Sequence, residues 1–419
     1  MKRTYLCIDL KTFYASVECA SRHLDPFKTN LVVADKSRGK GTICLAITPA
    51  MKKLGIRNRC RVFEIPSNIK YIVAPPRMAH YIKVSADVYA IYLRYIAKED
   101  IHVYSIDEAF LDVTNYLTLY KMSAKELALK IMDDIYKELH LTATAGIGTN
   151  LFLAKVALDI LAKHVPDNVA YLNEELFKEK VQTHLPLTDF WQIGRGIEKR
   201  LNKLNLYTLK DVSEADEDIL YKEFGINALF LIDHSKGKES CTIKEIKEYK
   251  PESISLTQGQ VLLRDYEYNE ALTILKEMVD LLSLDMIDKH LVGNSLNLYV
   301  GYSKNECSPT GGSLKITQVT NVASILKKHF VNMYKNTTNP FFMIRRINIS
   351  ISNLVDEDLE SLDLFTDPTK VNKERNSEKA MIEIKKRYGK NAIMKATDCL
   401  RESNLRERNN LIGGHKSGE

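Results

Sequence analysis

Two acidic residues, Asp107 and Glu108, lie side by side in a segment that is otherwise largely apolar and aromatic, VYSIDEAFLDV (103–113). Such a composition is typical of a half-buried strand or hairpin. Adjacent strand residues point to opposite faces, but a bend at 107–108 would let both carboxylates face one way. Clustered carboxylates raise one another's pKa, and a divalent cation removes that cost. The pair predicts a metal site, with a solvent-exposed turn as the alternative.

A third carboxylate, Asp9, follows the apolar run YLCI (5–8). An acid at the end of a buried strand is a candidate ligand, although it is equally suited to cap a following helix. Mg²⁺ prefers carboxylate and phosphate oxygens. Asp9, Asp107 and Glu108 are therefore the candidate catalytic and metal-binding residues.

The composition is that of a soluble chain of several domains: 419 residues, 45% hydrophobic and 27% charged. No apolar run approaches the ~18–20 residues of a membrane-spanning helix. The seven cysteines form no CxxC pair, which predicts a reducing cytoplasm and no zinc site. The net charge of +6 is uneven, since 36–63 and 307–355 are basic and contain no acid. These tracts favour contact with a polyanion, and an ordinary solvated face is the alternative.

The order of apolar and turn residues predicts mixed strands and helices up to about residue 165. The main expected elements are a strand at 4–10, helices at 77–97, 123–139 and 150–163, and a strand at 142–148. Short helices are expected at 170–240, followed by a polar linker at 241–250. Residues 251–355 have a strand, helix, strand, strand, helix, strand rhythm. Beyond 366 we expect one helix near 374–402 and a disordered or partner-dependent end.

Three motifs occur in one order along the chain: DLKTFYASVE (9–18), SIDEAFLDV (105–113) and AGIGTNLFLAK (145–155). They resemble the signature motifs of the Y-family translesion DNA polymerases, and the resemblance extends from residue 1 to about 365. The Gram-positive UmuC-like branch is resembled more closely than the DinB-like branch, because Lys11 replaces an acid and the finger segment is atypical.

The resemblance implies an α+β multidomain fold, the right-hand polymerase. Its parts would be a palm at 1–12 and 75–168, fingers at 13–74, a thumb at 169–240, a linker at 241–250, a little finger at 251–357 and a tail at 358–419. Two Mg²⁺ ions would be held by Asp9, Asp107, Glu108 and the backbone carbonyl of Leu10. Two-metal phosphoryl transfer needs little beyond such positioning and charge neutralisation.

The resemblance also assigns nucleotide contacts. Tyr14 would be the steric gate that excludes ribonucleotides, with Phe13 packed beside it. Lys163 would contact the triphosphate, although Lys155, Asp159 and Lys163 also have the spacing of a surface salt-bridge stripe. The family's finger Tyr and Arg are replaced by Pro49 and Lys52. Lys52 lacks the bidentate fork of Arg, which predicts a looser or rearranged triphosphate site.

Two further segments imply partners. The run IGRGIEKRL (193–201) resembles a helix-hairpin-helix, in which Ile193, Gly194, Arg195, Gly196 and Lys199 would hold a DNA phosphate. The segment LESLDLFTD (359–367) resembles the sliding-clamp peptide QLxLF, with Leu362, Leu364 and Phe365 as anchors and Ser361 in place of Gln. A small strand or helix packed on the little finger is the alternative reading of this segment.

We therefore expect a template-directed DNA polymerase that bypasses damaged bases with low fidelity, acting on primer–template DNA and deoxynucleoside triphosphates. We expect a cytoplasmic monomer without a membrane contact, and the need for UmuD- or RecA-like proteins stays open. The alternatives are a nucleotidyl cyclase and a catalytically inactive DNA-binding protein. The helix-hairpin-helix and clamp peptide speak against the first, and the three acids speak against the second.

Overall fold

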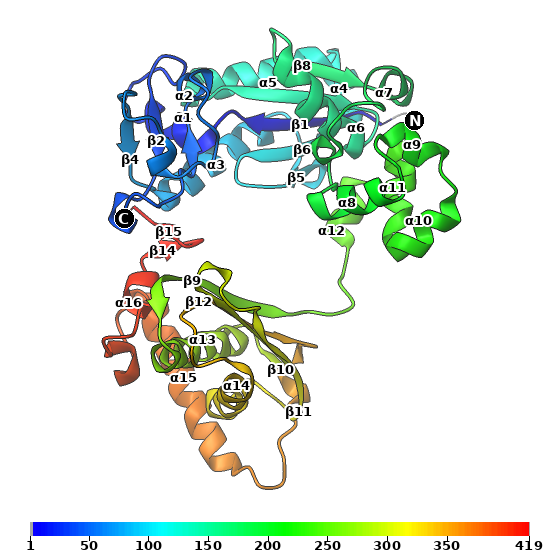
Figure 1. Ribbon diagram of the computed structural model, residues 1–419. Coiled ribbons are helices and arrows are strands. Elements are labelled where there is room, and N and C mark those ends of the chain that lie inside the picture. Colours follow the sequence, from blue (N-terminus) through cyan, green and yellow to red (C-terminus); the bar gives the residue numbers. More distant parts are fainter. Residues whose placement is uncertain (1–2, 419) are drawn as a thin grey trace. The chain divides into compact units, whose positions relative to one another are not determined.

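The computed structural model describes residues 3–418, and for Asn305 the backbone only. Its contacts divide the chain into two compact units, residues 1–249 with 417–419, and residues 250–416. Figure 1 shows the elements of both units along the chain.

The core of the first unit is a five-stranded sheet in the order β5-β6-β1-β7-β8 (Figure 1). The central strand β1 is antiparallel to β6 and β7, and β7 is parallel to β8. Its sequence YLCIDL is buried except at Asp9, as expected for a strand covered on both faces. The strands are β1 (Tyr5–Leu10), β5 (Ile101–Val103), β6 (Glu108–Asp112), β7 (Ala143–Gly148) and β8 (Val169–Leu172).

Two glycines of β7 let helix α6 (Leu151–Val156) pack directly on the sheet. A Cβ at Gly146 would lie 2.0 Å from the carbonyl oxygen of Ala154, and one at Gly148 would lie 2.1 Å from the Ala154 nitrogen. The motif AGIGTNLFLAK is therefore a close-packing motif, because any side chain at either glycine would push α6 away. Asn150 caps the helix by accepting from the Leu153 amide at 2.8 Å.

The other elements of this unit flank the central sheet. A small sheet, β3-β2-β4, combines β2 (Leu31–Val33), β3 (Ala46–Ile47) and β4 (Ile72–Ala74). The helices before α6 are α1 (Phe13–Ala20), α2 (Pro49–Lys53), α3 (Met78–Leu93), α4 (Thr114–Tyr120) and α5 (Ala124–Leu139). The later helices are α7 (Glu174–Lys180), α8 (Arg195–Lys203), α9 (Leu209–Glu214), α10 (Glu217–Phe224), α11 (Ala228–Ser235) and α12 (Ile243–Glu248).

The second unit has an antiparallel sheet in the order β11-β10-β12-β9, packed against two long helices. Buried and partly exposed residues alternate along β12, so Ile347, Ile349 and Ile351 face the helices. The elements are β9 (Leu256–Tyr266), α13 (Tyr268–Asp288), β10 (Leu291–Tyr302), β11 (Thr310–Thr320), α14 (Ala323–Thr337) and β12 (Ile344–Ser352). The expected strand–helix rhythm of 251–355 is confirmed.

Three segments differ from the sequence-based expectation. The helix expected at 150–163 widens after α6 into a π-helical turn at Ala157–Leu161 and ends in a 3-10 turn. The expected linker 241–250 contains α12, because Ile243 is buried against Tyr5, Cys7 and Phe110. The chain therefore stays with the first unit up to Tyr249.

The tail was expected to contain one helix near 374–402 and to end in a disordered or partner-dependent segment; a helix is present but begins earlier, and the described part of the end is folded. Helix α15 (Pro368–Tyr388) is followed by α16 (Leu405–Arg408) and the hairpin β14 (Leu411–Ile412) and β15 (His415–Lys416). Helix α15 packs on α13 through Ile382, which is buried with Leu284 and Ile287. The sequence signal was misleading because the tail is highly charged and its few apolar residues are far apart.

Candidate active site

The first and third candidate ligands are direct cross-strand neighbours. Asp9 of β1 pairs with Glu108 of β6 in the antiparallel register. Side chains of such a pair lie on the same face of a sheet, about 4.5–5.5 Å apart at Cβ. Strand pairing therefore brings together two acids that are 99 positions apart in the sequence.

The turn between β5 and β6 adds Asp107 to this pair. The amides of Tyr104 and Ser105 both donate to the Glu108 carbonyl at 3.0 Å, which closes the turn. The Asp107 carbonyl accepts from the Leu10 amide at 2.9 Å, so the two ligand-bearing segments are tied at this point. Ser105 orients the carboxylate by donating to Asp107 Oδ1 at 2.7 Å. The bend expected at 107–108 lies at 105–107, and Glu108 is already the first residue of β6.

The charges of the neighbouring acids act on Asp9, the most affected member of the cluster. Burial, followed by the charges of Asp107 and Glu108, raises the pKa of Asp9 to about 7. Oxygen donors crowded in this way match the preference of a hard divalent cation, so the donor set fits such an ion. Within residues 3–418, however, no three His, Cys, Asp or Glu side chains are grouped closely enough to hold a metal in this conformation.

Glu108 is engaged by Lys155 from α6. Lys155 Nζ lies 2.8 Å from Glu108 Oε1 and 2.9 Å from Asp159 Oδ2, and Cys7 donates to the same Oε1 at 3.0 Å. Burial acts to lower the pKa of Lys155, but the charges of Cys7, Glu108 and Asp159 raise it overall. Both contacts of Glu108 are made by Oε1, so Lys155 and Cys7 fix the position of one carboxylate oxygen.

Three lysines gather beside the acids. Burial and the charges of Lys163 and Lys52 lower the pKa of Lys11, whereas Asp9 raises it. Burial and Lys163 likewise lower the pKa of Lys52. Lys163 is also paired with Asp159 at 2.9 Å, so the expected stripe exists as well. Ammonium groups that repel one another next to a carboxylate cluster form a site for a polyanion such as a triphosphate.

Phe13 and Tyr14 begin helix α1 directly after a strained turn. Thr12 has φ 48°, a left-handed conformation that is uncommon for a β-branched residue. Phe13 is buried, and its ring centroid lies 5.7 Å from that of Tyr14. The turn thus directs Phe13 into the core and leaves Tyr14 partly exposed beside the acids.

The hairpin of the helix-hairpin-helix candidate lies between a three-residue 3-10 turn, Leu187–Asp189, and helix α8. Gly194 caps α8, Ile193 is buried, and Arg195, Gly196 and Lys199 are exposed around the first turn. Arg200 instead pairs with Glu223 at 2.7 Å. Trp191, expected in the thumb core, also packs on Phe110 with a centroid distance of 5.6 Å, and it donates to Tyr104 at 3.0 Å.

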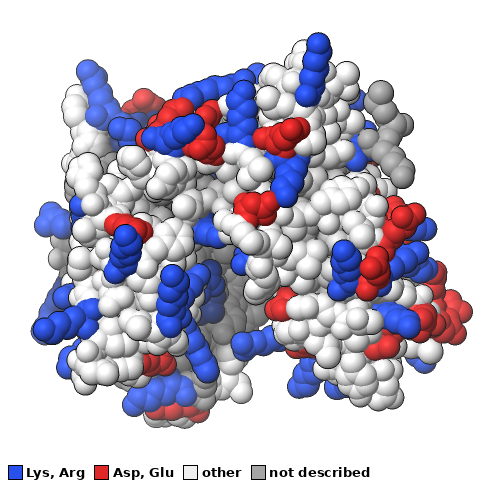
Figure 2. Space-filling view, turned by 90° about the horizontal axis from the view of Figure 1, so that it is seen from above, with Lys and Arg blue, Asp and Glu red and all other residues white. Residues whose placement is uncertain are grey.

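Some basic side chains of the tract 36–63 already have partners within the protein. Arg38 pairs with Asp35 at 3.5 Å, and Arg61 donates to the Gly41 carbonyl at 2.6 Å. On the face shown in Figure 2, Lys and Arg side chains are mixed with acidic ones. A DNA contact therefore depends on particular side chains rather than on a uniform basic surface.

The clamp-peptide candidate lies in the second unit, after β13 (Val355–Asp356). Ser361 forms a bridge to Val319 at the edge of the sheet. Leu362 is partly buried, whereas Leu364 and Phe365 are 99% and 96% exposed. Ser361 is therefore packed as a short strand would be, whereas the anchors Leu364 and Phe365 are not packed against the protein.

Comparison with known proteins decides the family. The profile of the impB/mucB/samB family matches residues 8–159, and that of its C-terminal domain matches residues 254–364. The putative UV-damage repair protein UvrX of Bacillus subtilis is 30% identical over 99% of this chain and 98% of its own length. The chain belongs to the impB/mucB/samB family. It is thus a Y-family translesion DNA polymerase.

Further relatives agree with this assignment. DNA polymerase IV 2 of Bacillus subtilis is 28% identical to this chain, and the match covers 99% of each of the two proteins. The solved Y-family DNA polymerase chimera Dbh-Dpo4(243-245)-Dbh has a TM-score of 0.65 at 21% identity and covers 84% of this chain and 99% of its own. The right-hand fold is confirmed, and the two alternative functions are not favoured. The family also implies a divalent-metal-dependent reaction.

Two further features of the polymerase bear on the surroundings in which it works. None of the helices within residues 3–418 is long and apolar enough to cross a membrane. All seven cysteines are free thiols.

Four side chains near the site were not assigned to it from the sequence. Lys11 was named only as an atypical residue, and Lys155 only as part of a signature motif and a salt-bridge stripe. Tyr81 stacks on Tyr14, but nothing in the sequence indicates this contact, because the two residues are far apart along the chain. Glu18 could have been found, since a charged residue one helical turn after Tyr14 in an apolar helix needs a buried partner.

Proposed function

We propose that Asp9, Asp107 and Glu108, with the carbonyl of Leu10, hold two Mg²⁺ ions for nucleotidyl transfer to a primer 3′-hydroxyl. The observation that carries this is the Asp9–Glu108 register pair, closed by the Leu10–Asp107 backbone hydrogen bond. When bound, divalent ions supply charge neutralisation at the phosphates and acidify the attacking hydroxyl.

The lysines have a separate role in this proposal. Lys52 and Lys163 bind the triphosphate, and Lys11 adds a third positive charge to the same site. Each lysine is a point charge without the planar fork of Arg. The position of the triphosphate therefore depends on the number of lysines and on the neighbouring acids. Burial, and after it the charges of neighbouring lysines, lower the pKa values of Lys11 and Lys52, and a bound polyanion would relieve that repulsion.

Tyr14 is the steric gate in this proposal, and Phe13 anchors the start of α1. The gate selects by collision: an aromatic ring at the sugar leaves no room for a 2′-hydroxyl. A gate of this kind must be rigid, because a ring that moves aside discriminates poorly. The buried Phe13 and the stacked Tyr81 support that requirement.

DNA is held by two surfaces of different design. In the thumb, Arg195 and Lys199 surround the exposed N-terminus of α8, whose free amides suit a phosphate. In the second unit, the sheet face opposite the helices carries Tyr299, Asn348 and Arg346, with the Arg346 guanidinium 5.7 Å from the Tyr299 ring. Both surfaces favour contact with the backbone, which is independent of sequence and sensitive to salt.

We also propose that Leu362, Leu364 and Phe365 dock into an apolar groove of a sliding clamp. The near-complete exposure of Leu364 and Phe365 supports this, since adjacent large apolar side chains on a soluble surface favour a partner. We place the polymerase in the cytoplasm as a monomer, in keeping with its free thiols.

The experiment that tests the acid cluster is primer extension by an Asp107→Ala variant. Removal of a ligand should lower extension at least about 100-fold, since about 2.7 kcal/mol of transition-state stabilisation is lost. The matched control is Asp112→Asn, because Asp112 ends the strand that follows Asp107 and pairs with Tyr5 at the far end of β1. Primer–template binding should persist in both variants, and full extension by Asp107→Ala would refute the site.

A further inference from the structure

Residues 361–366, here called the docking segment, are held by their polar side chains while their apolar side chains face outward. Ser361 exchanges two backbone hydrogen bonds with Val319, at 2.8 and 2.9 Å. Asp363 accepts from Gln318 at 2.6 Å through one oxygen, and from Thr366 at 2.6 Å through the other. The segment is therefore built in a fixed form and not left as a loose strand of chain.

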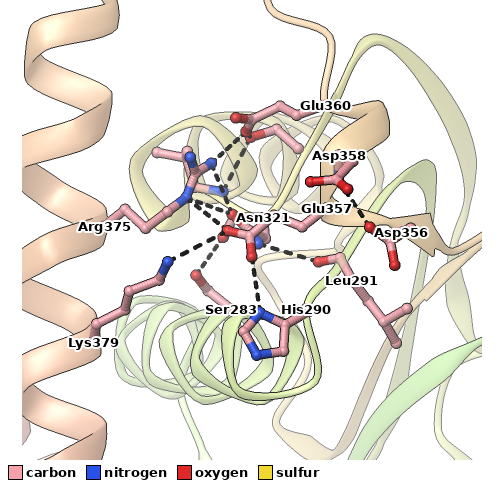
Figure 3. Close-up of polar contacts among 12 residues, drawn as sticks. Ser283, His290, Leu291, Asn321, Asp356, Glu357, Asp358, Glu360, Arg375 and Lys379 are labelled. Atoms are coloured by element: carbon pink, nitrogen blue, oxygen red, sulfur yellow. Dashed lines mark hydrogen bonds and ion pairs between the residues drawn. The ribbon is translucent and has the colours of Figure 1, made fainter.

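The residues just before the docking segment are fixed from the tail by Arg375 of α15. Its guanidinium donates to Asn321 Oδ1 at 3.1 Å, bonds Glu360 Oε1, and lies 3.4 Å from Glu357 Oε1. Figure 3 shows Arg375 reaching from the helix to Asn321 and the two carboxylates. The Arg375 side chain is only 12% exposed, so these contacts are largely shielded from solvent.

The partners of Arg375 are themselves anchored to the body of the second unit. Asn321 donates to the Leu291 carbonyl at 3.2 Å, and its own carbonyl accepts from Ser283. Glu360 also accepts from Thr320 at 2.9 Å, and Glu357 pairs with His290 at 3.1 Å. Arg375 thus connects the residues just before the docking segment to α13 and to the end of the sheet where β10 begins and β11 ends.

We infer that Arg375 is a positioning residue that presents Leu364 and Phe365 to the apolar groove of the sliding clamp. This inference rests on the clamp docking proposed above. Without the guanidinium, Glu357 and Glu360 would repel each other, and the chain before Ser361 would be freed. A partner would then have to order the docking segment on binding, which weakens affinity although no contact to the partner is lost.

The test measures the affinity of the full-length protein for a purified bacterial sliding clamp by isothermal titration calorimetry. Arg375→Ala should weaken binding about 5- to 20-fold, as expected when one to a few side chains must be ordered on binding. Glu360→Gln removes the charge from the loop side and leaves α15 intact, and it should weaken binding in the same direction. Lys379→Ala is the matched control, because Lys379 lies one turn along α15 and reaches Glu357 only at 3.8 Å.

A double variant, Leu364→Ala with Phe365→Ala, separates the two proposals. If it abolishes clamp binding while Arg375→Ala and Glu360→Gln bind like the wild type, the positioning role is wrong and clamp docking stands. If the double variant binds like the wild type, clamp docking itself is wrong. Hydrogen exchange gives a second readout: the amides of Ser361 and Val319 should exchange faster in Arg375→Ala, and unchanged protection would overturn the inference. Extension of a short primer without clamp should be equal in all variants.

Discussion

The ring of Tyr81 lies almost parallel to the ring of Tyr14, with centroids 4.6 Å apart and planes 23° apart. Tyr81 is fixed in turn by Glu18, which accepts from its hydroxyl at 2.8 Å and from Arg77 at 2.8 and 3.1 Å. The buried Glu18 is satisfied by these donors, so the stack rests on a rigid polar base. Tyr14 is therefore supported from behind, as a steric gate requires.

Removal of either ring should relax sugar selection. Tyr14→Ala should raise the relative use of ribonucleotides about 10- to 100-fold, the equivalent of about 1.4–2.8 kcal/mol. Tyr81→Ala should produce a smaller increase, because Tyr14 keeps its ring but loses its backing. Single-nucleotide insertion with matched ribo- and deoxynucleotides measures both. Tyr14→Phe keeps the ring and is the control; unchanged selection in Tyr14→Ala would reject the gate.

Lys52 should act on nucleotide binding more than on chemistry. Lys52→Ala removes one of the three positive charges at the triphosphate site, so the KM for deoxynucleotides should rise about tenfold, or about 1.4 kcal/mol, with a smaller change in kcat. Lys52→Arg should lower KM, since the guanidinium adds a bidentate contact. Steady-state insertion kinetics provide both constants. Lys53→Ala on the same short helix is the control, and an equal effect there would rule out a specific role.

The second unit should lose stability as pH rises from about 4.5 to 7. Glu277 of α13 is 2% exposed, and burial, aided by the charge of Asp398, raises its pKa to about 7. Between these pH values the unfolded state loses the proton first, so the free energy of unfolding falls, on the order of 1–3 kcal/mol. Glu277→Gln does not titrate and should therefore be more stable than the wild type at pH 8.

Differential scanning calorimetry at pH 5 and pH 8 tests this prediction. The stabilisation of Glu277→Gln should be large at pH 8 and nearly absent at pH 5. Glu306→Gln, which changes an exposed carboxylate of the same unit, should have the same small effect at both pH values. A gain that is equal at both pH values would mean that Glu277 is not the titrating group.

The thumb should contribute salt-dependent DNA affinity. Arg195→Ala with Lys199→Ala removes two exposed charges beside the α8 N-terminus, so primer–template affinity should fall and the slope of log affinity against log salt should shrink by about 1–2. Fluorescence anisotropy over a salt series measures the slope. Arg200→Ala is the control, because Arg200 already pairs with Glu223. A slope unchanged from the wild type would exclude the phosphate contact.

Asp9, Asp107 and Glu108 could be picked out from the sequence because each lies at or beside the end of an apolar run in a recognisable motif. The register that pairs Asp9 with Glu108 could not be predicted from pattern alone, because the runs in β1 and β6 are continuously buried and do not alternate. The Tyr81 stack could not be predicted, since nothing local in α3 indicates which ring it meets. The folded tail was also missed: Arg375 and Lys395 appear in the sequence as solvent charges, yet they pair with Glu360 and Asp280 in the structure. The spacing of charged residues in a sequence does not indicate which distant residue each one pairs with when it is buried.

The central claim is that Asp9, Asp107 and Glu108 together bind the catalytic metal ions. Anomalous diffraction from a crystal of the polymerase with primer–template DNA, an incoming nucleotide and Mn²⁺ tests it most directly. The account predicts two anomalous peaks about 2.0–2.3 Å from these carboxylate oxygens, one of them also next to the carbonyl of Leu10. Metal peaks that lie elsewhere, or an Asp9 carboxylate that makes no metal contact, would contradict it.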